Sequence, residues 1–158
     1  MKKIPLFRVA SWGNGQAKLA IIGEGPGETE NRRGEPFVGV SGTLMRKCII
    51  DLGYRPVDFW LCNIWKYRPP NNKYTKASET NNIEESEAIA QLIQELKNVK
   101  PNCLLLLGNN VLQALTEYKG ITEYRGSIMN TKVGIKAVAT FHPAGLLQMA
   151  QTLSLIHI

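Results

Sequence analysis

Glu24, Asn63 and His142 each stand at the end of a short apolar run, where side chains of these types could do chemistry. Glu24 places a carboxylate at the tip of its run. The amide of Asn63 presents a donor and an acceptor together, which suits the edge of a nucleobase. The imidazole of His142 can hydrogen-bond a carbonyl oxygen and stabilise charge that develops there. The alternative is structural, because a lone asparagine often satisfies loop backbone and a lone histidine often simply packs.

Residues 23–39 read GEGPGETENRRGEPFVG, a glycine-rich segment crowded with charged residues. It is not a phosphate-binding P-loop, because no G-K-[ST] closes it, and its glycines do not follow G-x-G-x-x-G. Gly25 and Gly27 would let a flat ligand approach the backbone closely, and Phe37 offers a ring for stacking. A long solvent-exposed loop with Phe37 as its buried anchor is the alternative interpretation.

Apolar runs of strand length alternate with segments of helical periodicity. This alternation predicts a three-layer α/β/α protein with a central, mainly parallel four-stranded sheet. Ligands bind such sheets at the carboxyl ends of the strands, so Glu24, Asn63 and His142 should converge on one crevice. Residues 65–82 are expected to be loop, because two prolines interrupt helix formation there. The expected strands are 17–23, 59–64, 102–108 and 135–141, and the expected helices are 41–53, 83–99 and one that begins within 110–115.

The helix expected over 41–53 has clear end signals. Ser41 is of the type that caps a helix start, and Gly53 is of the type that follows a helix end. Helical spacing gathers apolar residues on one side, which we expect to face the core. That face is predicted to consist of Leu44, Cys48, Ile49 and Leu52.

The composition is that of a soluble globular domain, with 44% hydrophobic and 20% charged residues among 158. The formal charge of +6 is compatible with a polyanionic partner but does not by itself indicate one. No run approaches the ~20 apolar residues of a membrane-spanning helix, and no signal peptide is evident. We therefore expect a cytoplasmic protein without membrane contact. No C-x-x-C pair exists, so the three cysteines are expected to be buried thiols: Cys48, Cys62 and Cys103.

The last six residues, LSLIHI, look unlike a native protein end and resemble translated vector sequence. For this reason we assign His157 no function. We expect a single domain over residues 1–152, truncated at its C-terminus, and a non-native tail over residues 153–158.

Four motifs, which follow one another along the chain, contain these residues and connect them into one pattern. They read GEGPG (23–27), GEPFVG (34–39), NIWKYRPP (63–70) and HPAGLL (142–147). Together they resemble the uracil-DNA glycosylase superfamily, most closely its thermophile-type family 4. The resemblance spans about residues 17–150, because KPNCLLLLGNNVLQAL (100–115) is similar to the strand–glycine–helix segment of that family. It implies a DNA glycosylase that starts base-excision repair.

By this resemblance, catalysis would fall to Glu24, Asn63 and His142. Asn63 would hydrogen-bond the edge of a uracil flipped out of the DNA, and His142 would stabilise the departing uracil anion. Glu24 would position or polarise the attacking water. The substrate-binding set implied is Gly25, Glu30, Phe37, Asn63 and His142, in which Phe37 stacks on the base.

The resemblance also suggests a DNA-binding rim. Cationic side chains and a helix start would contact phosphates, and leucines after His142 would enter the gap left by the flipped base. A solvated charged rim without a DNA role is the alternative for the cations. The residues expected to contact DNA are Arg32, Arg33, Ser41, Lys66, Arg68, Leu146 and Leu147.

One departure from the family is large. Family 4 holds an iron–sulfur cluster on four cysteines, whereas this chain has three cysteines in other positions, and Tyr67 stands where one ligand is expected. We therefore predict that no cluster and no other cofactor is bound. The Tyr67 loop would then be held by packing alone.

The leading hypothesis is therefore a monomeric uracil-DNA glycosylase acting on single- or double-stranded DNA that contains uracil. The alternative is a non-catalytic, glycosylase-like module that binds nucleic acid within a replication or phage protein. A weaker third hypothesis is a hydrolase of free nucleosides or nucleotides.

Overall fold

The computed structural model describes the backbone of residues 7–156 and the side chains of residues 7–150. Its centre is a six-stranded sheet in the order β1-β3-β2-β4-β6-β5. Four of these strands run parallel in the middle of the sheet, as the alternation of apolar runs and helices predicted. They are β2 (Leu19–Gly23), β3 (Phe59–Asn63), β4 (Cys103–Leu107) and β6 (Lys136–Thr140).

The prediction of four strands was incomplete, because two short antiparallel strands close the edges. β1 (Trp12–Gly13) pairs with β3, and β5 (Ile128–Asn130) pairs with β6. Strands of two and three residues carry no measurable alternation of apolar and polar side chains, so their sequences gave no signal.

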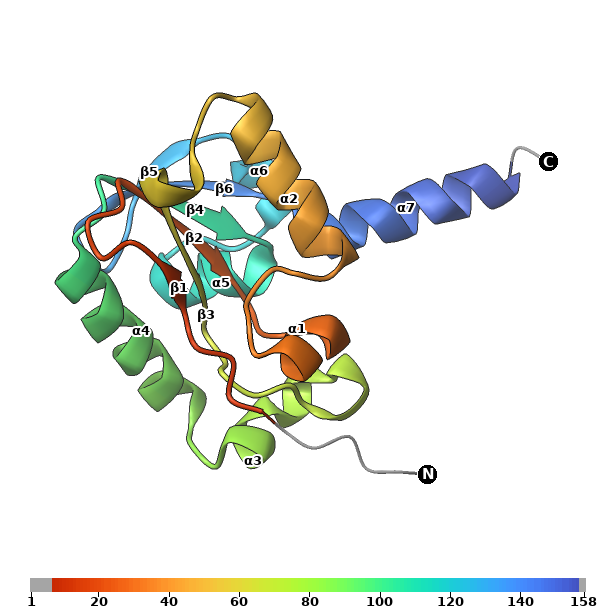
Figure 1. Ribbon diagram of the computed structural model, residues 1–158, viewed down its shortest axis with the longest axis horizontal. Helices are drawn as coiled ribbons and strands as arrows, with labels where there is room; N and C mark the ends of the chain where they lie inside the picture. The colour runs from red at the N-terminus through yellow and green to blue at the C-terminus, as the bar shows by residue number, and fades with distance from the viewer. Residues whose placement is uncertain (1–6, 157–158) are drawn as a thin grey trace.

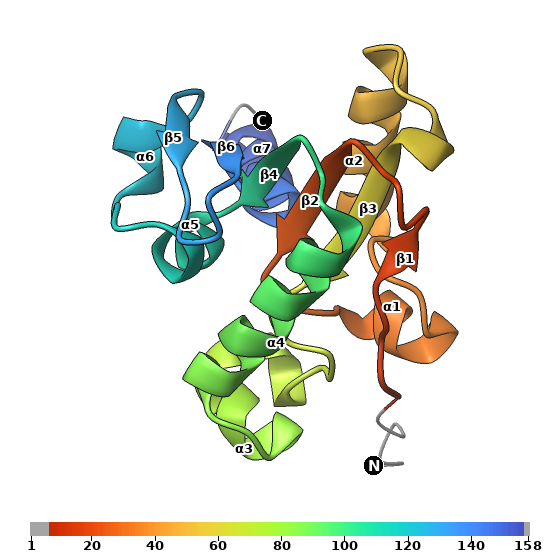
Figure 2. The same cartoon turned by 90° about the vertical axis from the view of Figure 1, so that its left-hand side faces the viewer.

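Helices cover both faces of the sheet, which confirms the three-layer arrangement (Figure 1). α4 (Glu85–Val99) and α5 (Asn109–Leu115) pack on one face, where Leu92, Leu96 and Leu112 are fully buried. α2 (Val40–Asp51) packs on the other face through Met45 and Ile49. Figure 2 shows the strands side by side, with α4 in front of the sheet and α2 behind it.

The segment 65–82 is more ordered than the predicted loop. Two single turns of 3-10 helix, Pro70–Asn72 and Tyr74–Lys76, lead into the short helix α3 (Ala77–Asn81). Asn71 and Asn72, in the first of these turns, both adopt the left-handed backbone conformation, with φ of 54° and 56°. Asparagine tolerates this region better than most residues, which is why it suits such a turn. The prolines therefore exclude a long helix but not short turns.

The predicted core face of α2 was right only for Ile49. Gly42, Met45 and Ile49 point inward, whereas Leu44, Cys48 and Leu52 are exposed. The sequence offers apolar residues on both sides of this helix, so periodicity alone could not select the buried side.

Of the two predicted end signals of α2, one is confirmed and the other is wrong. Gly53, with φ of +90°, follows the end of the helix as predicted. Ser41 does not cap the start, because the N-cap residue is Gly39 and no side chain caps it. The cysteine prediction was wrong for two of three residues, since Cys62 is buried but Cys48 and Cys103 are exposed.

Three further helices are α1 (Glu28–Arg33), α6 (Ile121–Tyr124) and α7 (Pro143–Ile156). α7 begins directly after His142 and extends outward from the rest of the molecule (Figure 1). The predicted tail 153–158 lies outside the described side chains, and its last two residues lie outside the described backbone. In the described part of the chain no helix combines the length and apolarity needed to cross a membrane.

Candidate active site

A cavity of about 380 Å³ opens at the carboxyl edge of the parallel strands. α1, the start of α2 and the start of α7 surround this edge (Figure 1). Glu24, Asn63 and His142 all line it, which is the convergence expected of strand ends in a parallel sheet. The full lining is Glu24, Gly25, Gly27, Glu30, Phe37, Ser41, Asn63, Asn72, Tyr74, His142, Ala144 and Gln148.

Asn63 occupies the deepest part of the strand edge. It pairs in register with Gly23 of β2, and only 4% of its surface is exposed. A Cβ added to Gly23 would lie 2.5 Å from Asn63 Oδ1 and 2.8 Å from the Phe37 ring, so only glycine leaves room for both. Within the described residues no hydrogen bond holds the Asn63 amide, and no fully enclosed side-chain polar atom lacks a partner. The amide is therefore free to bind a ligand in the cavity.

Phe37 is held in a strained conformation. Its φ of 56° lies in the left-handed region, which costs a non-glycine residue about 1–3 kcal/mol. Arg46 of α2 fixes this turn, since its Nε donates to Phe37 O and its Nη2 donates to Pro36 O, both at 2.9 Å. Gly42 makes room for it, because a Cβ there would collide with the Phe37 backbone. Strain maintained by several contacts is typical of functional positions.

His142 is prepared to donate a hydrogen bond from one nitrogen. The backbone N–H of Ala144 donates to His142 Nδ1 at 3.2 Å. In a neutral imidazole the other nitrogen, Nε2, then carries the proton. Burial lowers the pKa of His142 below its usual value, against an opposing effect of Glu30, so the neutral form is favoured near pH 7.

Glu24 follows β2 and is fixed by a residue that the sequence did not single out. Asn110 Nδ2, in the first turn of α5, donates to Glu24 Oε1 at 2.5 Å. Burial raises the pKa of Glu24, the Asn110 hydrogen bond lowers it, and the charge of Glu85 raises it. The net effect is a carboxyl group whose pKa lies above its ordinary value.

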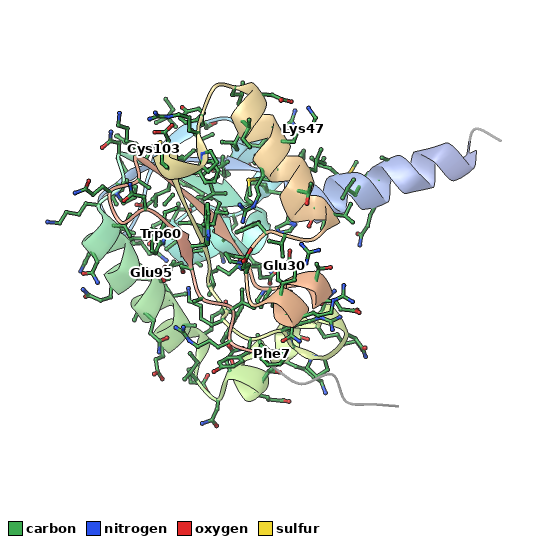
Figure 3. All side chains as sticks on the ribbon, viewed as in Figure 1. Phe7, Glu30, Lys47, Trp60, Glu95 and Cys103 are labelled. Carbon is green, nitrogen blue, oxygen red and sulfur yellow. The ribbon has the colours of Figure 1, made fainter. Side chains whose placement is uncertain are left out.

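Glu30 lines the cavity and also joins two of its walls. It belongs to α1, is buried, and its Oε1 accepts a hydrogen bond from Gly39 N at 2.7 Å, just before α2 begins (Figure 3). The carboxylate therefore fixes the start of α2 against α1. Ser41, at the second position of α2, lines the same cavity.

Several residues of this site were not predicted from the sequence. Asn72 and Tyr74 enter the cavity from the segment 65–82, which was expected to be plain loop. Arg46 and Asn110 act from helices; Arg46 stands outside the motifs, and Asn110 lies in the segment 100–115 without having been assigned a role. The asparagine pair 71–72 was a usable signal, because two adjacent asparagines favour a tight, fixed turn.

The predicted cationic rim is only partly available. Arg32 and Arg33 are exposed on α1. Arg68 contacts Glu28 at 3.6 Å, and its Nε donates to Asn72 Oδ1 at 2.8 Å, so it supports the cavity lining.

Lys66 does not fit the predicted role in DNA binding. Its Nζ is buried between Ser11 Oγ at 2.9 Å and Glu95 Oε2 at 3.0 Å. Trp60 Nε1 donates to the other oxygen of Glu95, and Figure 3 shows these two side chains together between β3 and α4. An ammonium group paired in this way serves the structure, so we remove Lys66 from the DNA-binding set.

Leu146 and Leu147 lie on the second turn of α7, not on an irregular loop tip. Leu146 is 42% exposed. Leu147 lines a second hollow of about 330 Å³ that shares Glu30, Ser41 and Gln148 with the main cavity. Leu147 therefore lies beside the candidate site, whereas Leu146 is exposed and lines neither hollow.

The Tyr67 segment is not held by packing alone, contrary to the prediction. The amide of Asn81 accepts hydrogen bonds at Oδ1 from Lys66 N and Tyr67 N, at 3.3 and 3.0 Å. Its Nδ2 donates to Tyr67 O and to Ala77 O. One side chain thus fastens the start of the segment 65–82 to α3.

The cysteines do not fit a four-cysteine iron–sulfur cluster. The chain contains three, and the described residues include no group of metal-ligating side chains. Cys62 lies in the core, where its thiol donates to Ile21 O and burial raises its pKa far above the usual range. A thiol held protonated is a poor metal ligand. That the protein binds no cofactor stays a prediction.

Fold and site together define an α/β protein with a ligand-sized cavity of about 380 Å³ at the carboxyl edge of its sheet. The chain belongs to the Uracil DNA glycosylase superfamily, whose sequence model matches residues 10–156. It is 35% identical over 143 residues to the type-4 uracil-DNA glycosylase of Thermotoga maritima, covering 89% of this chain and 71% of that protein. The type-4 enzyme of Archaeoglobus fulgidus is 30% identical over 147 residues, covering 88% and 71%.

A different kind of protein also matches. A DNA polymerase of Bacillus phage SP01 is 26% identical over 137 residues, which cover 86% of this chain and 14% of the polymerase. The similarity is thus confined to a small part of that polymerase.

Proposed function

We propose that the protein is a uracil-DNA glycosylase that hydrolyses the bond between uracil and deoxyribose in DNA. One observation carries the proposal: the buried Asn63 amide faces the cavity with no hydrogen-bond partner among the described residues. Because this amide opens onto the cavity, it can offer both a donor and an acceptor to a base bound there. The type-4 uracil-DNA glycosylases that resemble this chain support uracil as that ligand.

The base enters the cavity by leaving the DNA stack. A glycosidic bond inside a stacked duplex is out of reach of side chains at the bottom of a cavity, so the nucleotide must flip outward. Phe37 then stacks on the uracil ring, while Asn63 bonds both a carbonyl oxygen and a ring N–H. The backbone at Gly25 lets the base approach closely.

The chemical step is hydrolysis with a dissociative character. The bond between uracil N1 and sugar C1′ breaks, and its electron pair leaves with the base as the uracil anion. His142 donates from Nε2 to a uracil carbonyl oxygen and stabilises that charge. The oxygen of a water molecule, positioned by Glu24, bonds to C1′, and its released proton balances the charge of the anion.

The DNA backbone is held at the mouth of the cavity. Exposed Arg32 and Arg33 attract phosphates, and the start of α2 at Ser41 offers backbone N–H groups to a further phosphate. Leu146 and Leu147 fill the gap that the flipped base leaves. Arg68 adds positive charge at the cavity wall.

The salt dependence of DNA binding tests this rim. Each of Arg32→Ala and Arg33→Ala should reduce the slope of log K against log salt by about 0.9 for duplex DNA, the change expected for one lost phosphate contact. Lys66→Met is the control, because Lys66 is paired inside the protein, and its slope should equal that of the wild type. A reduced slope for Lys66→Met would restore it to the rim.

A non-catalytic DNA-binding module is the second candidate, and the phage DNA polymerase that resembles the chain favours it. An oligonucleotide containing one uracil, followed by alkaline cleavage, separates the two. We expect strand scission with the wild type and a reduction of about 10²–10³-fold in Asn63→Ala and His142→Ala. Binding of the oligonucleotide without scission by the wild type would favour the module and contradict the enzyme.

A further inference from the structure

We propose that Tyr74 forms a second wall of the base cavity and limits the bases that the protein accepts to pyrimidines. This rests on the proposed function, since it assumes that the cavity receives a nucleobase. Tyr74 lies in the segment 65–82 and lines the cavity together with Phe37 and Asn63, which come from other segments. No motif contains it.

The Tyr74 ring lies directly against Gly25. A Cβ added to Gly25 would lie 2.8 Å from Tyr74 Oη and 2.9 Å from Cζ, closer than real Cβ atoms approach other atoms. The backbone φ of Gly25 is not in the left-handed region, so no backbone conformation requires glycine there. The absence of a side chain at position 25 is therefore explained by the ring at position 74.

The orientation of the ring is fixed at its far end. Tyr74 Oη donates a hydrogen bond to Pro26 O at 3.0 Å. Burial, followed by the charges of Glu24 and Glu30, raises the pKa of Tyr74 well above its usual range, against an opposing effect of Arg68. The phenol is therefore protonated near neutral pH and available as a donor to Pro26 O.

The segment that carries Tyr74 is itself held on both sides. Before it, Arg68 Nε donates to Asn72 Oδ1. A hydrogen bond from Asn72 N to Pro69 O, at 3.1 Å, closes a tight turn there. After it, Lys76 N donates to Lys73 O at 2.9 Å, and the Asn81 amide fastens α3 to Tyr67. Tyr74 is thus part of a fixed wall and not of a mobile lid.

An aromatic wall can select among bases sterically, by limiting the size of the base that fits beside it. A purine needs room for a second ring, and the Tyr74 side chain fills the space beside the Gly25 backbone, where we infer that this ring would lie. Removing the phenol group should open that volume without touching Asn63 or His142. The ratio of purine to pyrimidine binding should then rise.

The test measures binding separately from catalysis. Oligonucleotides carrying 2′-fluoro-deoxyuridine or 2′-fluoro-deoxyinosine resist cleavage, because the fluorine destabilises the cationic sugar. For Tyr74→Ala we expect the Kd ratio of inosine to uridine oligonucleotide to fall at least about tenfold relative to wild type. Tyr74→Phe keeps the ring and should stay close to the wild-type ratio. Tyr54→Ala, at an exposed tyrosine after α2, is the control and should match the wild type.

A ratio of two affinities does not change when part of the sample is unfolded, so a merely structural role of Tyr74 would leave it unmoved. An unchanged ratio in Tyr74→Ala overturns the wall assignment even if uracil is released normally. A changed ratio without uracil release by the wild type leaves the wall assignment standing and overturns the proposed activity. Failure of the wild type to distinguish either oligonucleotide from unmodified DNA overturns both.

A double substitution tests the contact itself. Gly25→Ala alone should weaken binding of the uridine oligonucleotide about tenfold or more, because its Cβ and the Tyr74 ring need the same space. In a Tyr74→Ala background the same change should have little effect. Equal losses in both backgrounds would contradict the pairing of Gly25 with Tyr74.

Discussion

Two walls of the cavity are built in different ways. The first, residues 23–42, positions Phe37 through a strained backbone turn, a glycine that makes room and an arginine that bonds two carbonyls. The second, residues 65–82, positions Tyr74 through side-chain amides, with Asn81 fastening one end. The first wall depends on residues with no close substitute, whereas the second depends on hydrogen bonds that other polar residues can partly replace.

This difference explains why only one wall was visible in the sequence. Glycines beside an aromatic residue form a motif, because each position has one physical solution. A segment held by amides reads as an ordinary polar loop, since asparagine is common in loops of every kind. The first wall should therefore be far more sensitive to substitution than the second.

The largest effect is expected at Gly42. In Gly42→Ala the new Cβ collides with the Phe37 backbone, which cannot move without losing its bonds to Arg46. We expect a loss of about 2–3 kcal/mol in unfolding free energy and a comparable loss of uracil release. Denaturant unfolding provides the measurement, and Gly145→Ala, at a helical glycine with open space around it, is the matched control. Equal stabilities of the two variants would refute the close fit at Gly42.

Arg46→Ala comes next. The change removes both hydrogen bonds that hold the Pro36 and Phe37 carbonyls, so Phe37 should relax from its left-handed conformation. We expect kcat/KM for a uracil oligonucleotide to fall by at least about tenfold, because part of the free energy of these two charged hydrogen bonds positions Phe37 for the reaction. Lys47→Ala, on the exposed side of the same helix, should keep wild-type kinetics. Normal kinetics in Arg46→Ala would separate Phe37 from the reaction.

A smaller effect is expected at Asn81, in the second wall. Asn81→Ala leaves the backbone groups of Lys66 and Tyr67 without their partner, which should lower stability by about 1–2 kcal/mol. Water can replace part of these bonds, so uracil release should fall less than in Arg46→Ala. Glu79→Ala, at an exposed position of the same helix, is the control. A greater loss of activity in Asn81→Ala than in Arg46→Ala would reverse the ranking of the two walls.

The smallest effect is a displacement of the pH profile. Asn110→Ala removes the bond that lowers the pKa of Glu24, while burial and the charge of Glu85 continue to raise it. The carboxylate form is lost as the pH falls through this pKa, so the acid limb of kcat/KM should move to higher pH. Gln113→Ala, on the same helix, is the control. The neighbouring Asn109 is not used, because its side chain accepts a hydrogen bond from Gly120 N. An unmoved acid limb would exclude Glu24 as the group that titrates.

The sequence predicted the parts of the molecule that follow simple periodic rules. The four central strands and α4 carry long, regular apolar patterns, and strand order then brings Glu24, Asn63 and His142 to one edge. The short edge strands were not predicted, because their patterns are too short to recognise. The buried side of α2 was not predicted, because its apolar residues fit two faces equally well.

Long-range side-chain contacts were also beyond the sequence. Lys66 looked like a surface cation within a basic motif, yet Glu95, 29 positions away, pairs with it inside the protein. Asn110 and Glu24 are separated by 86 positions. Nothing local in the sequence indicates such partners, since only the folded sheet brings them together.

A crystal structure of the protein with uracil tests the central claim most directly. We predict the base in the cavity, with its ring stacked on Phe37, its edge bonded to the Asn63 amide and a carbonyl oxygen within hydrogen-bond distance of His142 Nε2. Uracil bound elsewhere, or in this cavity without contact to Asn63 and His142, would contradict the account.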